Sequence, residues 1–283
     1  MTAQWDTVTI VGVGLIGGSA GLALAKRGAA KKIIGVGRSN SSLAAAKELG
    51  AITESTTNIR EGVADADFVL VATRVSVIGN QLEEIDACVR PGTPITDAGS
   101  TKQSIVERWE QRRSSRTGRF VGSHPLAGSH QRGPQAADPT LFEGKLTVLT
   151  PAESTPKGDT EAISAFWQQI GAQACFLSPS EHDQLLASAS HAPHIVAAAL
   201  ATATPREAHR FTAGGWRDTT RIAAGDPDLW ADILLDNAKA VTAQIENFTK
   251  VSDQLQHAIE EGDRSTLIKL LTLAKESRDA LGS

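Results

Sequence analysis

Short apolar runs alternate with longer amphipathic segments over the first part of the chain. The runs are TVTIVGVG, KIIGVG, DFVLVAT, TPITDAG, RFVGSHP, KLTVLT and AQACFLSP, and most end in Gly, Pro or polar residues. The segments between them, such as SNSSLAAAKELG and TEAISAFWQQIG, have helical composition and length. This alternation predicts a Rossmann-type doubly wound, mainly parallel sheet with helices on both faces.

The pattern changes near residue 178. From Pro179 onward every periodic segment follows helical spacing, and we expect no further strand. We therefore predict an α/β nucleotide-binding domain over residues 1–178 and an all-helical domain over residues 179–283. Leu and Ile repeat at intervals of three and four residues in the long C-terminal helices. This apolar face could pack equally well against a second subunit or against a core within one chain.

Composition excludes several function classes. The formal net charge is −4, which indicates neither nucleic acid nor a polybasic membrane contact. The uncharged stretch 8–25 approaches the length of a membrane span, but it holds five glycines, and we interpret it as a buried strand and helix. The two cysteines lack the spacing of a disulfide framework or a zinc site, which fits a cytoplasmic protein without a bound metal.

A glycine motif follows the first predicted strand. Gly12, Gly14 and Gly17 have GxGxxG spacing between an apolar strand and a helix. In this context the motif predicts a dinucleotide whose pyrophosphate lies at the helix N-terminus. We expect Leu15 and Ile16, which lie within the motif, to contact the cofactor as well.

The end of the second predicted strand bears on which dinucleotide binds. An acidic residue there would bind the ribose diol of NAD, but this chain has Arg38 and Ser39 after Gly37. An arginine and a hydroxyl suit a 2′-phosphate, so NADP is favoured; stacking of Arg38 on adenine would allow NAD equally. Thr73, in the loop after the DFVLV strand, is expected to lie against the cofactor.

Candidate reactive residues follow the later strands and recur in the helical half. Ser100 in TDAGSTK and His124 in GSHPLAGSHQRG should both face the nicotinamide, because chemistry in such sheets occurs beyond the carboxyl ends of the strands. Ser100 is also a candidate for capping the next helix. In the helical half, His191 and His194 flank Pro193, which should kink the helix.

Five motifs in this order resemble the prephenate/arogenate dehydrogenase family of tyrosine biosynthesis. They are GLIGGS, DAGSTK, GSHPLAGS, SHAPH and RDTTRIAAGDPDLW, and they extend over nearly the whole chain. The resemblance implies a Rossmann domain followed by a helical dimerisation domain, and therefore a homodimer. It also implies NAD(P)-dependent oxidative decarboxylation of a cyclohexadienol.

The resemblance also implies residue roles. His124 would accept the hydrogen bond from the substrate ring hydroxyl, and Ser100 would bind the same hydroxyl and fix the imidazole. Arg221 would bind a substrate carboxylate, while His191 and Trp230 would line the substrate pocket. An ordinary ion pair with Asp218, three residues earlier, is the alternative role for Arg221.

One position departs from the family pattern. His130 stands where relatives commonly carry Glu, and the resemblance implies that this residue meets Asp218 across the mouth of the site. A His130–Asp218 pair would attract only when the imidazole is protonated, so such a gate would respond to pH near neutrality. The missing acid slightly favours prephenate over arogenate as the substrate, because arogenate carries an ammonium that an acid would bind.

Three alternatives to a prephenate dehydrogenase follow from the same residues. The first is an arogenate dehydrogenase. The second is a β-hydroxyacid or imine dehydrogenase, although such enzymes typically use a helical Lys where this chain has His191. The third is a non-catalytic NADPH-binding regulator, which would need no convergence of His124, Ser100 and Arg221.

Overall fold

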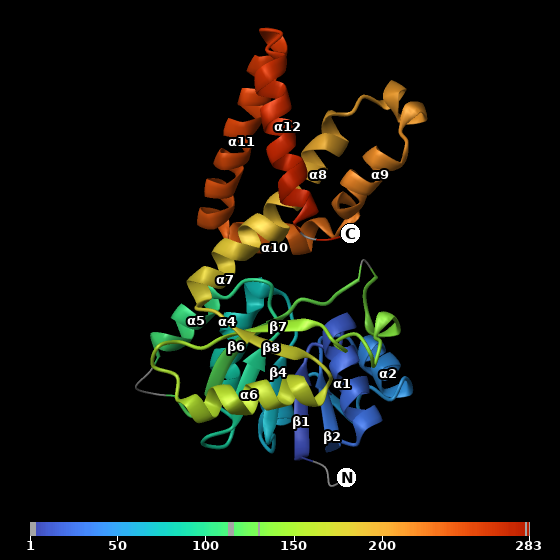
Figure 1. The fold of residues 1–283 in the computed structure, drawn as a ribbon. Coiled ribbons are helices and arrows are strands. Elements are labelled where there is room, and N and C mark those ends of the chain that lie inside the picture. Colours follow the sequence, from blue (N-terminus) through green and yellow to red (C-terminus); the bar gives the residue numbers. More distant parts are fainter. Residues whose placement is uncertain (1–3, 113–115, 130, 281, 283) are drawn as a thin grey trace.

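The computed structural model describes residues 4–112, 116–129, 131–280 and 282. It has two parts (Figure 1), an α/β part built on one sheet and a helical part that lies over one edge of that sheet. The helical part begins at Pro179, directly after the last strand and its short exit segment.

The sheet has eight strands in the order β3-β2-β1-β4-β5-β6-β7-β8. The strands are β1 (Trp5–Val11), β2 (Ala30–Val36), β3 (Glu54–Thr56), β4 (Phe68–Val71), β5 (Pro94–Asp97), β6 (Arg119–Pro125), β7 (Leu146–Thr150) and β8 (Gln173–Phe176). All neighbours pair in parallel except β6 and β7, which are antiparallel. The first six strands have the order of a dinucleotide-binding fold, whose crevice opens between β1 and β4.

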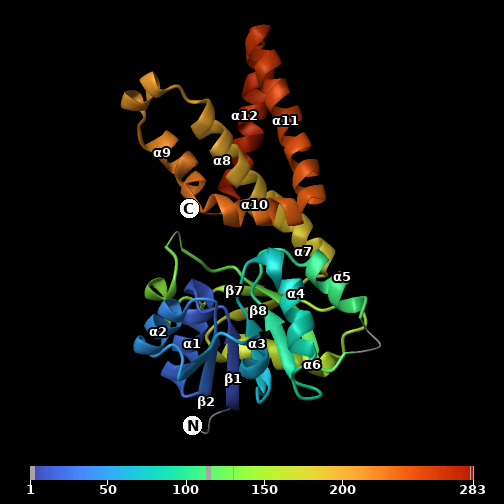
Figure 2. The same cartoon turned by 180° about the vertical axis from the view of Figure 1, so that it is seen from behind.

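Helices cover both faces of the sheet (Figure 2). They are α1 (Leu15–Arg27), α2 (Asn40–Glu48), α3 (Ile59–Val63), α4 (Val75–Asp86), α5 (Gln103–Glu110) and α6 (Lys157–Gln169), with a short 3-10 turn η2 (Pro134–Ala136). One apolar core joins α1, α2 and α6 to the sheet, and a second joins α3, α4 and α5 to the opposite face. The Rossmann-type sheet predicted from the sequence is therefore confirmed.

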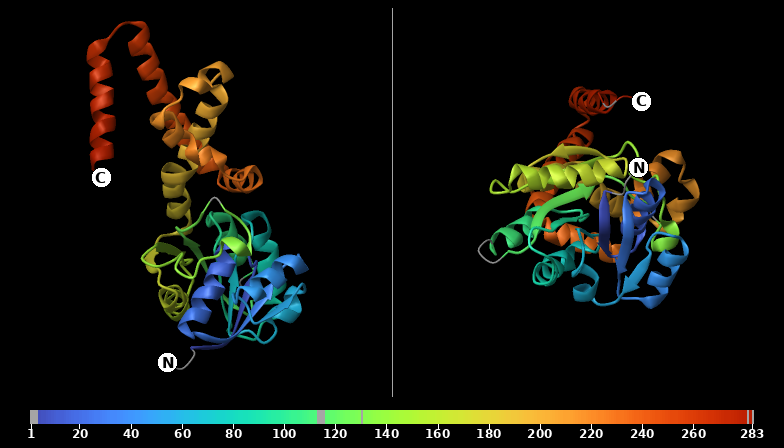
Figure 3. Two further views of the ribbon diagram at one scale, coloured as in Figure 1. Left: turned by 90° about the vertical axis from the view of Figure 1, so that its right-hand side faces the viewer. Right: turned by 90° about the horizontal axis from the view of Figure 1, so that it is seen from below.

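The helical part starts as one long run and ends as a hairpin. The run consists of α7 (Pro179–Leu186), the π-helical turn η3 (Ala187–His191) and α8 (Ala192–Ala203). It is followed by η4 (Arg206–Phe211), α9 (Gly214–Thr220), η5 (Arg221–Ala224), α10 (Pro227–Asp236), α11 (Ala238–Glu260) and α12 (Arg264–Asp279). Figure 3 shows α12 lying away from the elements other than α11, and α12 contains no buried residue.

The π-helical turn lies where the sequence predicts a kink. Pro193 has no N–H to donate to the carbonyl of Ala189, four residues earlier, so regular α-helical bonding cannot continue through this point. The run 179–203 is the one described segment whose length and mean hydropathy, 1.2, would also suit a membrane span. It nevertheless carries buried His182, Asp183 and His191, of which His182 and Asp183 bond to the α/β part.

Two short elements of the α/β part were not predicted from the sequence. Strand β3 has three residues and helix α3 has five, which is too short for either periodicity to be visible. The uncharged stretch 8–25 contributes to β1 and α1, and most of its side chains are buried, as expected for a strand and helix of the core.

Two glycines allow the turn between β1 and α1 to form. Gly12 has φ of 97°, a left-handed conformation that L side chains rarely adopt, and a Cβ there would lie 2.6 Å from the carbonyl oxygen of Ala72. A Cβ on Gly17 would lie 1.9 Å from the carbonyl oxygen of Gly12. By contrast, a Cβ on Gly14 would have no heavy atom within 4 Å. The first and third glycines of the motif are therefore required by packing alone.

We predict that Gly17→Ala destabilises the protein and Gly14→Ala does not. The added methyl group on Gly17 must displace backbone, which we expect to lower the free energy of unfolding by roughly 1–3 kcal/mol. Urea unfolding followed by circular dichroism measures both variants against the wild type. Equal midpoints for the two variants would contradict this account of the turn.

Candidate functional site

The helical part lies over the carboxyl ends of the strands (Figure 1), where loops carry several of the predicted site residues. The loops after β1, β4, β5 and β6 open toward this edge, and α7 and α10 approach it from the helical part. Ser76 at the start of α4 donates to Asp232 of α10 at 2.7 Å, and Thr101 donates to Asp236 at 2.6 Å. These bonds hold the helical part against the loops that carry the candidate chemistry.

The loop after β1 is shaped to receive a phosphate. The Gly12 N–H donates to the Val36 carbonyl at 2.8 Å, which ties the turn to the end of β2. Helix α1 begins after Gly14, and no side chain of the described residues caps its first N–H groups. Uncapped N–H groups at a helix N-terminus attract an anion, and the absent Cβ at Gly14 leaves open space beside them. This arrangement fits the pyrophosphate of a dinucleotide.

The polar residues after β2 are partly committed to local structure. Ser39 caps α2 by accepting from the Ser42 N–H at 3.4 Å, and its hydroxyl also lies 2.7 Å from that of Ser41. Arg38 is exposed and forms no ion pair with any residue in the described ranges. Thr73, in the loop after β4, donates its hydroxyl proton to Gln81 at 2.5 Å. The Arg38 side chain, just after the end of β2, is thus available to bind an anionic ligand.

His124 is the penultimate residue of β6 and is half-buried. Its Nδ1 atom lies 2.9 Å from Nε2 of His182, a residue of α7. Removal from water lowers the pKa of His124 well below 6.5, and the nearby imidazole of His182 and ammonium of Lys102 act in the same direction. The ring is therefore neutral at pH 7, and Nε2 makes no hydrogen bond within the described structure.

The sequence missed His182 and Asp183, the two residues behind His124. Nδ1 of His182 lies 2.8 Å from Oδ1 of Asp183, whose carboxylate also accepts from the Lys102 and Gln103 N–H groups at 2.8 and 2.9 Å. The carboxylate thus caps α5 from the side. The only local signal was a His–Asp pair in the first turn of a well-capped helix, which is equally typical of an exposed helix start.

A second buried cluster anchors β5 to β6. Lys102 is fully buried, and its Nζ donates to Asp97 and, at 2.9 Å, to the Ser123 carbonyl. Asp97 also accepts from the Ser123 N–H at 3.0 Å and the Gly99 N–H at 2.8 Å. Burial lowers the pKa of Lys102 against the opposing attraction of Asp97. The cluster places a paired charge directly beneath the residue before His124.

Ser100 lies in the loop after β5, half-buried, without a hydrogen bond to any described residue. Helix α5 begins at Gln103 and has no side-chain cap from its own N-cap residue, so Ser100 does not serve as the helix cap. The observed hydrogen-bond partner of His124 is His182, where the resemblance implied that Ser100 fixes the imidazole. The expected contact of Ser100 with a substrate hydroxyl stays a prediction.

His191 and Trp230 come together on the helical side. His191 is buried at the end of the π-helical turn, with Nδ1 3.1 Å from the amide nitrogen of Asn237. Burial lowers its pKa to about 4, although the carboxylate of Asp183 acts in the opposite direction. Trp230 of α10 stacks on His194 at a ring separation of 3.6 Å and presents its edge to His191 at 6.2 Å. His194 therefore supports the tryptophan.

Arg221 and Asp218 do not form the ordinary ion pair that was the alternative for them. Asp218 lies on α9, whereas Arg221 begins the following 3-10 turn, and both side chains are exposed. Within the described ranges neither takes part in an ion pair. The Arg221 guanidinium is thus available to a ligand.

The predicted partner of Asp218 at the mouth, His130, lies outside the described residues. A different ion pair crosses from the same loop to the helical part. Asp226, the N-cap of α10, contacts Arg132 at 2.6 Å and Arg74 at 3.7 Å. Both arginines belong to loops at the carboxyl ends of strands. Arg132 and Asp226 therefore link the β6 exit loop to the element that carries Trp230.

Known proteins share both parts of this architecture. The family described as "Prephenate dehydrogenase, nucleotide-binding domain" matches residues 20–176, and "Prephenate dehydrogenase, dimerization domain" matches residues 178–273. The prephenate dehydrogenase of Bacillus subtilis is 38% identical over 288 residues, covering 99% of this chain and 77% of the relative. A cyclohexadienyl dehydrogenase of Zymomonas mobilis is 31% identical, covering 97% of this chain and 95% of that protein.

Solved structures agree with these matches. The prephenate dehydrogenase of A. aeolicus, in complex with hydroxyphenyl propionate and NAD+, has a TM-score of 0.88 and 33% identity, with 98% of each chain covered. Synechocystis arogenate dehydrogenase has a TM-score of 0.83 and 29% identity, covering 97% of this chain and 99% of that one. Because the two family matches together cover most of the residues and these relatives align along nearly the full length, the chain belongs to the prephenate dehydrogenase family.

Proposed function

We propose that this protein catalyses the NAD(P)-dependent oxidative decarboxylation of prephenate to 4-hydroxyphenylpyruvate. Membership of the family and the activities named for its relatives support this reaction. The single observation that carries it is the state of His124. This ring lies at the carboxyl edge of the sheet, is neutral at pH 7, and has one nitrogen free among the described contacts.

His124 would act as the base. Its Nε2 accepts the proton of the ring hydroxyl, and the negative charge that builds on oxygen helps the same carbon release a hydride. A bound nicotinamide would supply the hydride acceptor. The bond from the ring to its carboxylate then breaks, its electron pair enters the ring, and CO2 leaves. The phenolate that forms takes back the proton held on His124 and becomes a phenol, and aromatisation makes the step effectively irreversible.

The remaining predicted residues would bind the substrate. We assign a substrate carboxylate to Arg221, whose planar guanidinium pairs with two oxygens. We assign the ring hydroxyl to Ser100 as well as His124. His191 and Trp230 would line the pocket, since they contact one another on the helical side of the edge. Asp218 and His130 would lie at its mouth.

Arogenate is the second candidate substrate, because one of the similar solved structures is an arogenate dehydrogenase. Synechocystis arogenate dehydrogenase shares 29% identity with this chain. Arogenate carries an ammonium where prephenate carries a ketone, so an unpaired acid in the pocket would favour it. Asp226 is already paired with Arg132 and Arg74, whereas Asp218 at the mouth forms no ion pair with a described residue. Prephenate is our first choice because the relatives named prephenate dehydrogenase match at up to 38% identity.

For the cofactor, we propose that NADP is preferred over NAD. The pyrophosphate would lie on Gly12, Gly14 and Gly17, with Leu15 and Ile16 beside it. The absence of an acid after β2 and the exposed, unpaired Arg38 support a 2′-phosphate there. Ser39 can add a hydroxyl, although it also caps α2, and Thr73 lies in the loop across the crevice.

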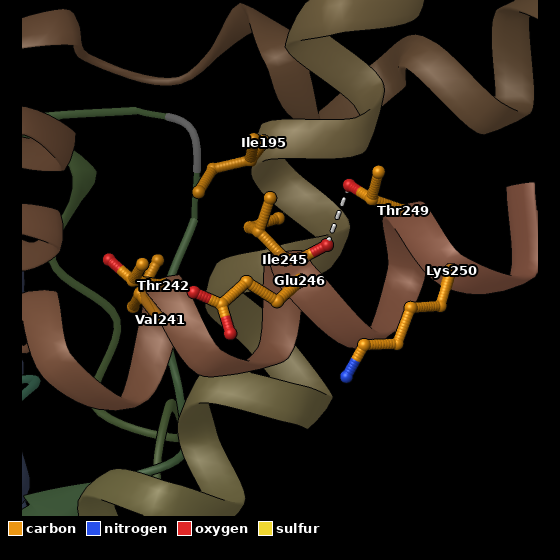
Figure 4. Close-up of a pocket in the computed structure, with 7 residues that line it drawn as sticks. All are labelled: Ile195, Val241, Thr242, Ile245, Glu246, Thr249 and Lys250. Carbon is orange, nitrogen blue, oxygen red and sulfur yellow. Dashed lines mark hydrogen bonds between the residues drawn. The ribbon is translucent and has the colours of Figure 1, made fainter. Parts of the chain in front are cut away.

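A homodimer through the helical part is our proposal for the assembly. Exposed apolar side chains line the α11–α12 hairpin, among them Phe248, Val251, Ile268 and Leu271. A pocket between α8 and α11 (Figure 4) adds Ile195, Val241 and Ile245 to the same half of the molecule. A surface this apolar on so exposed a hairpin is typical of a protein interface.

Two broader proposals follow from the same features. We propose a division of the chain into residues 1–178 and 179–283, supported by the position of every described strand before Pro179. We also propose that the protein acts in the cytoplasm, supported by unpaired cysteines and by a reaction that consumes a nicotinamide cofactor. Fractionation of cells that express the protein tests the second, and limited proteolysis near residue 178 tests the first.

We predict turnover of prephenate by the wild type and a loss on the order of 10²–10⁴ in kcat for His124→Asn, because the base is removed. Absorbance of the reduced nicotinamide measures the rate with prephenate and arogenate, each with NAD and NADP. His209→Asn, at an exposed position of η4, is the control. Activity must also persist below pH 6.5, since protonation of His124 is displaced to lower pH. No signal in any of the four assays would overturn the proposed function.

We predict that Arg38→Ala raises the KM for NADP on the order of 10- to 100-fold and changes that for NAD little, because only NADP loses a charge-assisted contact. Lys31→Ala removes a positive charge near the start of β2, the strand that ends two residues before Arg38, and is the control. Equal effects on the two cofactors would assign Arg38 to adenine stacking.

We predict a dimer of about twice 29.7 kDa in sedimentation velocity. Leu271→Glu on α12 should raise the dissociation constant at least about tenfold, because it places a charge in an apolar interface. Leu146→Glu, which is exposed on β7, should leave the dimer intact. A monomeric wild type at micromolar concentration would contradict the assembly.

A further inference from the structure

His182 and Asp183 are buried polar residues that the proposed mechanism does not yet use. They occupy the first turn of α7, where their exposed fractions are 0% and 3%. A capping box between Ser178 and Glu181, with Pro179 at the first helical position, holds this turn. Their side chains are therefore placed rigidly behind His124.

A directional hydrogen-bond chain runs from Asp183 to His124. The Asp183 carboxylate accepts from two backbone N–H groups and faces Nδ1 of His182 at 2.8 Å. A carboxylate only accepts, so Nδ1 of His182 must carry the proton. In a neutral His182, Nε2 is then an acceptor, and Nδ1 of His124 at 2.9 Å must be the donor.

We propose that the Asp183–His182 pair is a positioning device that fixes His124 as the tautomer protonated on Nδ1, which leaves the Nε2 lone pair free to accept the substrate proton. The proposal rests on the proposed function, because it explains how His124 is prepared for that step. The other tautomer would present an N–H to the hydroxyl and could not accept its proton.

Charged groups from several elements surround the two rings. Asp183 faces it from α7, and the Lys102 ammonium lies close enough to lower the pKa of His124 from the loop before α5. Lys102 is itself paired with Asp97 of β5, and Asp236 of α10 binds the neighbouring Thr101.

The same residue, Asp183, joins the base to the substrate side through its main chain. Asn237, between α10 and α11, donates to the main-chain carbonyl of Asp183 and lies 3.1 Å from Nδ1 of His191. Asp183 thus contacts the start of α5, the relay to His124 and the residue that orients His191. A shift of α7 would alter both imidazoles together, which makes this turn a common support for the site.

Asp183→Asn is the decisive variant. With its oxygen at the Oδ2 position, the amide still accepts from the Gln103 N–H. Its NH2 then replaces Oδ1, where it faces His182 and no longer accepts from the Lys102 N–H. This orientation reverses the proton positions along the chain. His124 then carries its proton on Nε2. The analogous change in serine-protease triads lowers kcat by about 10⁴ through the wrong tautomer. We expect a fall in kcat on the order of 10²–10⁴, with KM for substrate and cofactor within about twofold.

Two substitutions at His182 separate positioning from packing. The amide of His182→Gln reaches the place of Nε2 and can accept from His124, whereas the amide of His182→Asn reaches only the place of Nδ1. We expect His182→Gln to retain kcat at least about tenfold above His182→Asn. Both variants are compared with His209→Asn, and thermal unfolding is recorded for each. Equal losses that follow the loss in stability would overturn the positioning role.

A direct readout does not depend on turnover. Long-range 1H–15N spectra of protein labelled at its seven histidines show which ring nitrogen carries the proton. His124→Asn identifies the His124 signals by their disappearance. We expect a protonated Nδ1 on His124 in the wild type and a protonated Nε2 in Asp183→Asn.

The two kinds of failure are distinguishable. A wild-type His124 with its proton on Nε2, or a doubly protonated His182, overturns the relay whatever the enzyme converts. A correct tautomer in a protein that turns over neither prephenate nor arogenate leaves the relay standing and overturns the proposed function.

Discussion

The carboxylate of Asp183 is the constraint on which the arrangement of the site depends. It belongs to the helical part, yet it caps α5 of the α/β part through the Lys102 and Gln103 N–H groups. Helix N-termini carry unsatisfied donors and a partial positive charge, so a buried carboxylate is held strongly there. Through His182 the same group reaches His124. The Asp183 carboxylate thus fixes the position of the helical part relative to the α/β part at the place where proton transfer is proposed.

Buried polar groups elsewhere in the site follow the same rule. Lys102 and Asp97 are both fully excluded from water, and each charge is compensated by the other and by main-chain groups of β6 and the β5 exit loop. Removing one partner of such a pair leaves an uncompensated charge, which is far more costly than the pair itself. The cluster therefore fixes the spacing of β5 and β6, and with it the position of His124 above the crevice.

Much of the fold and part of the site were predictable from local pattern. The alternation of apolar runs and amphipathic segments identified seven of the eight strands, and the glycine motif located the turn after β1. Pro193 predicted a kink in the helix, and the structure has a π-helical turn just before it. Strand β3 and helix α3 were not predicted, because three and five residues are too few to show a strand or helix periodicity in hydrophobic positions. The role of His182 was not predicted, because a histidine next to an aspartate at the start of a helix forms no distinctive sequence motif.

The sequence by itself determined the two kinds of secondary structure, the glycine turn and the histidine at the end of β6, because each depends on residues close together along the chain. Tertiary structure alone decided that Asp183 would cap α5, that His182 would reach His124, and that Asp226 would pair with Arg132. These contacts join residues that are 58 to 94 positions apart in the chain. Hydrogen bonds and ion pairs act over a few ångströms, so such partners are set only when the helical part packs on the strand ends.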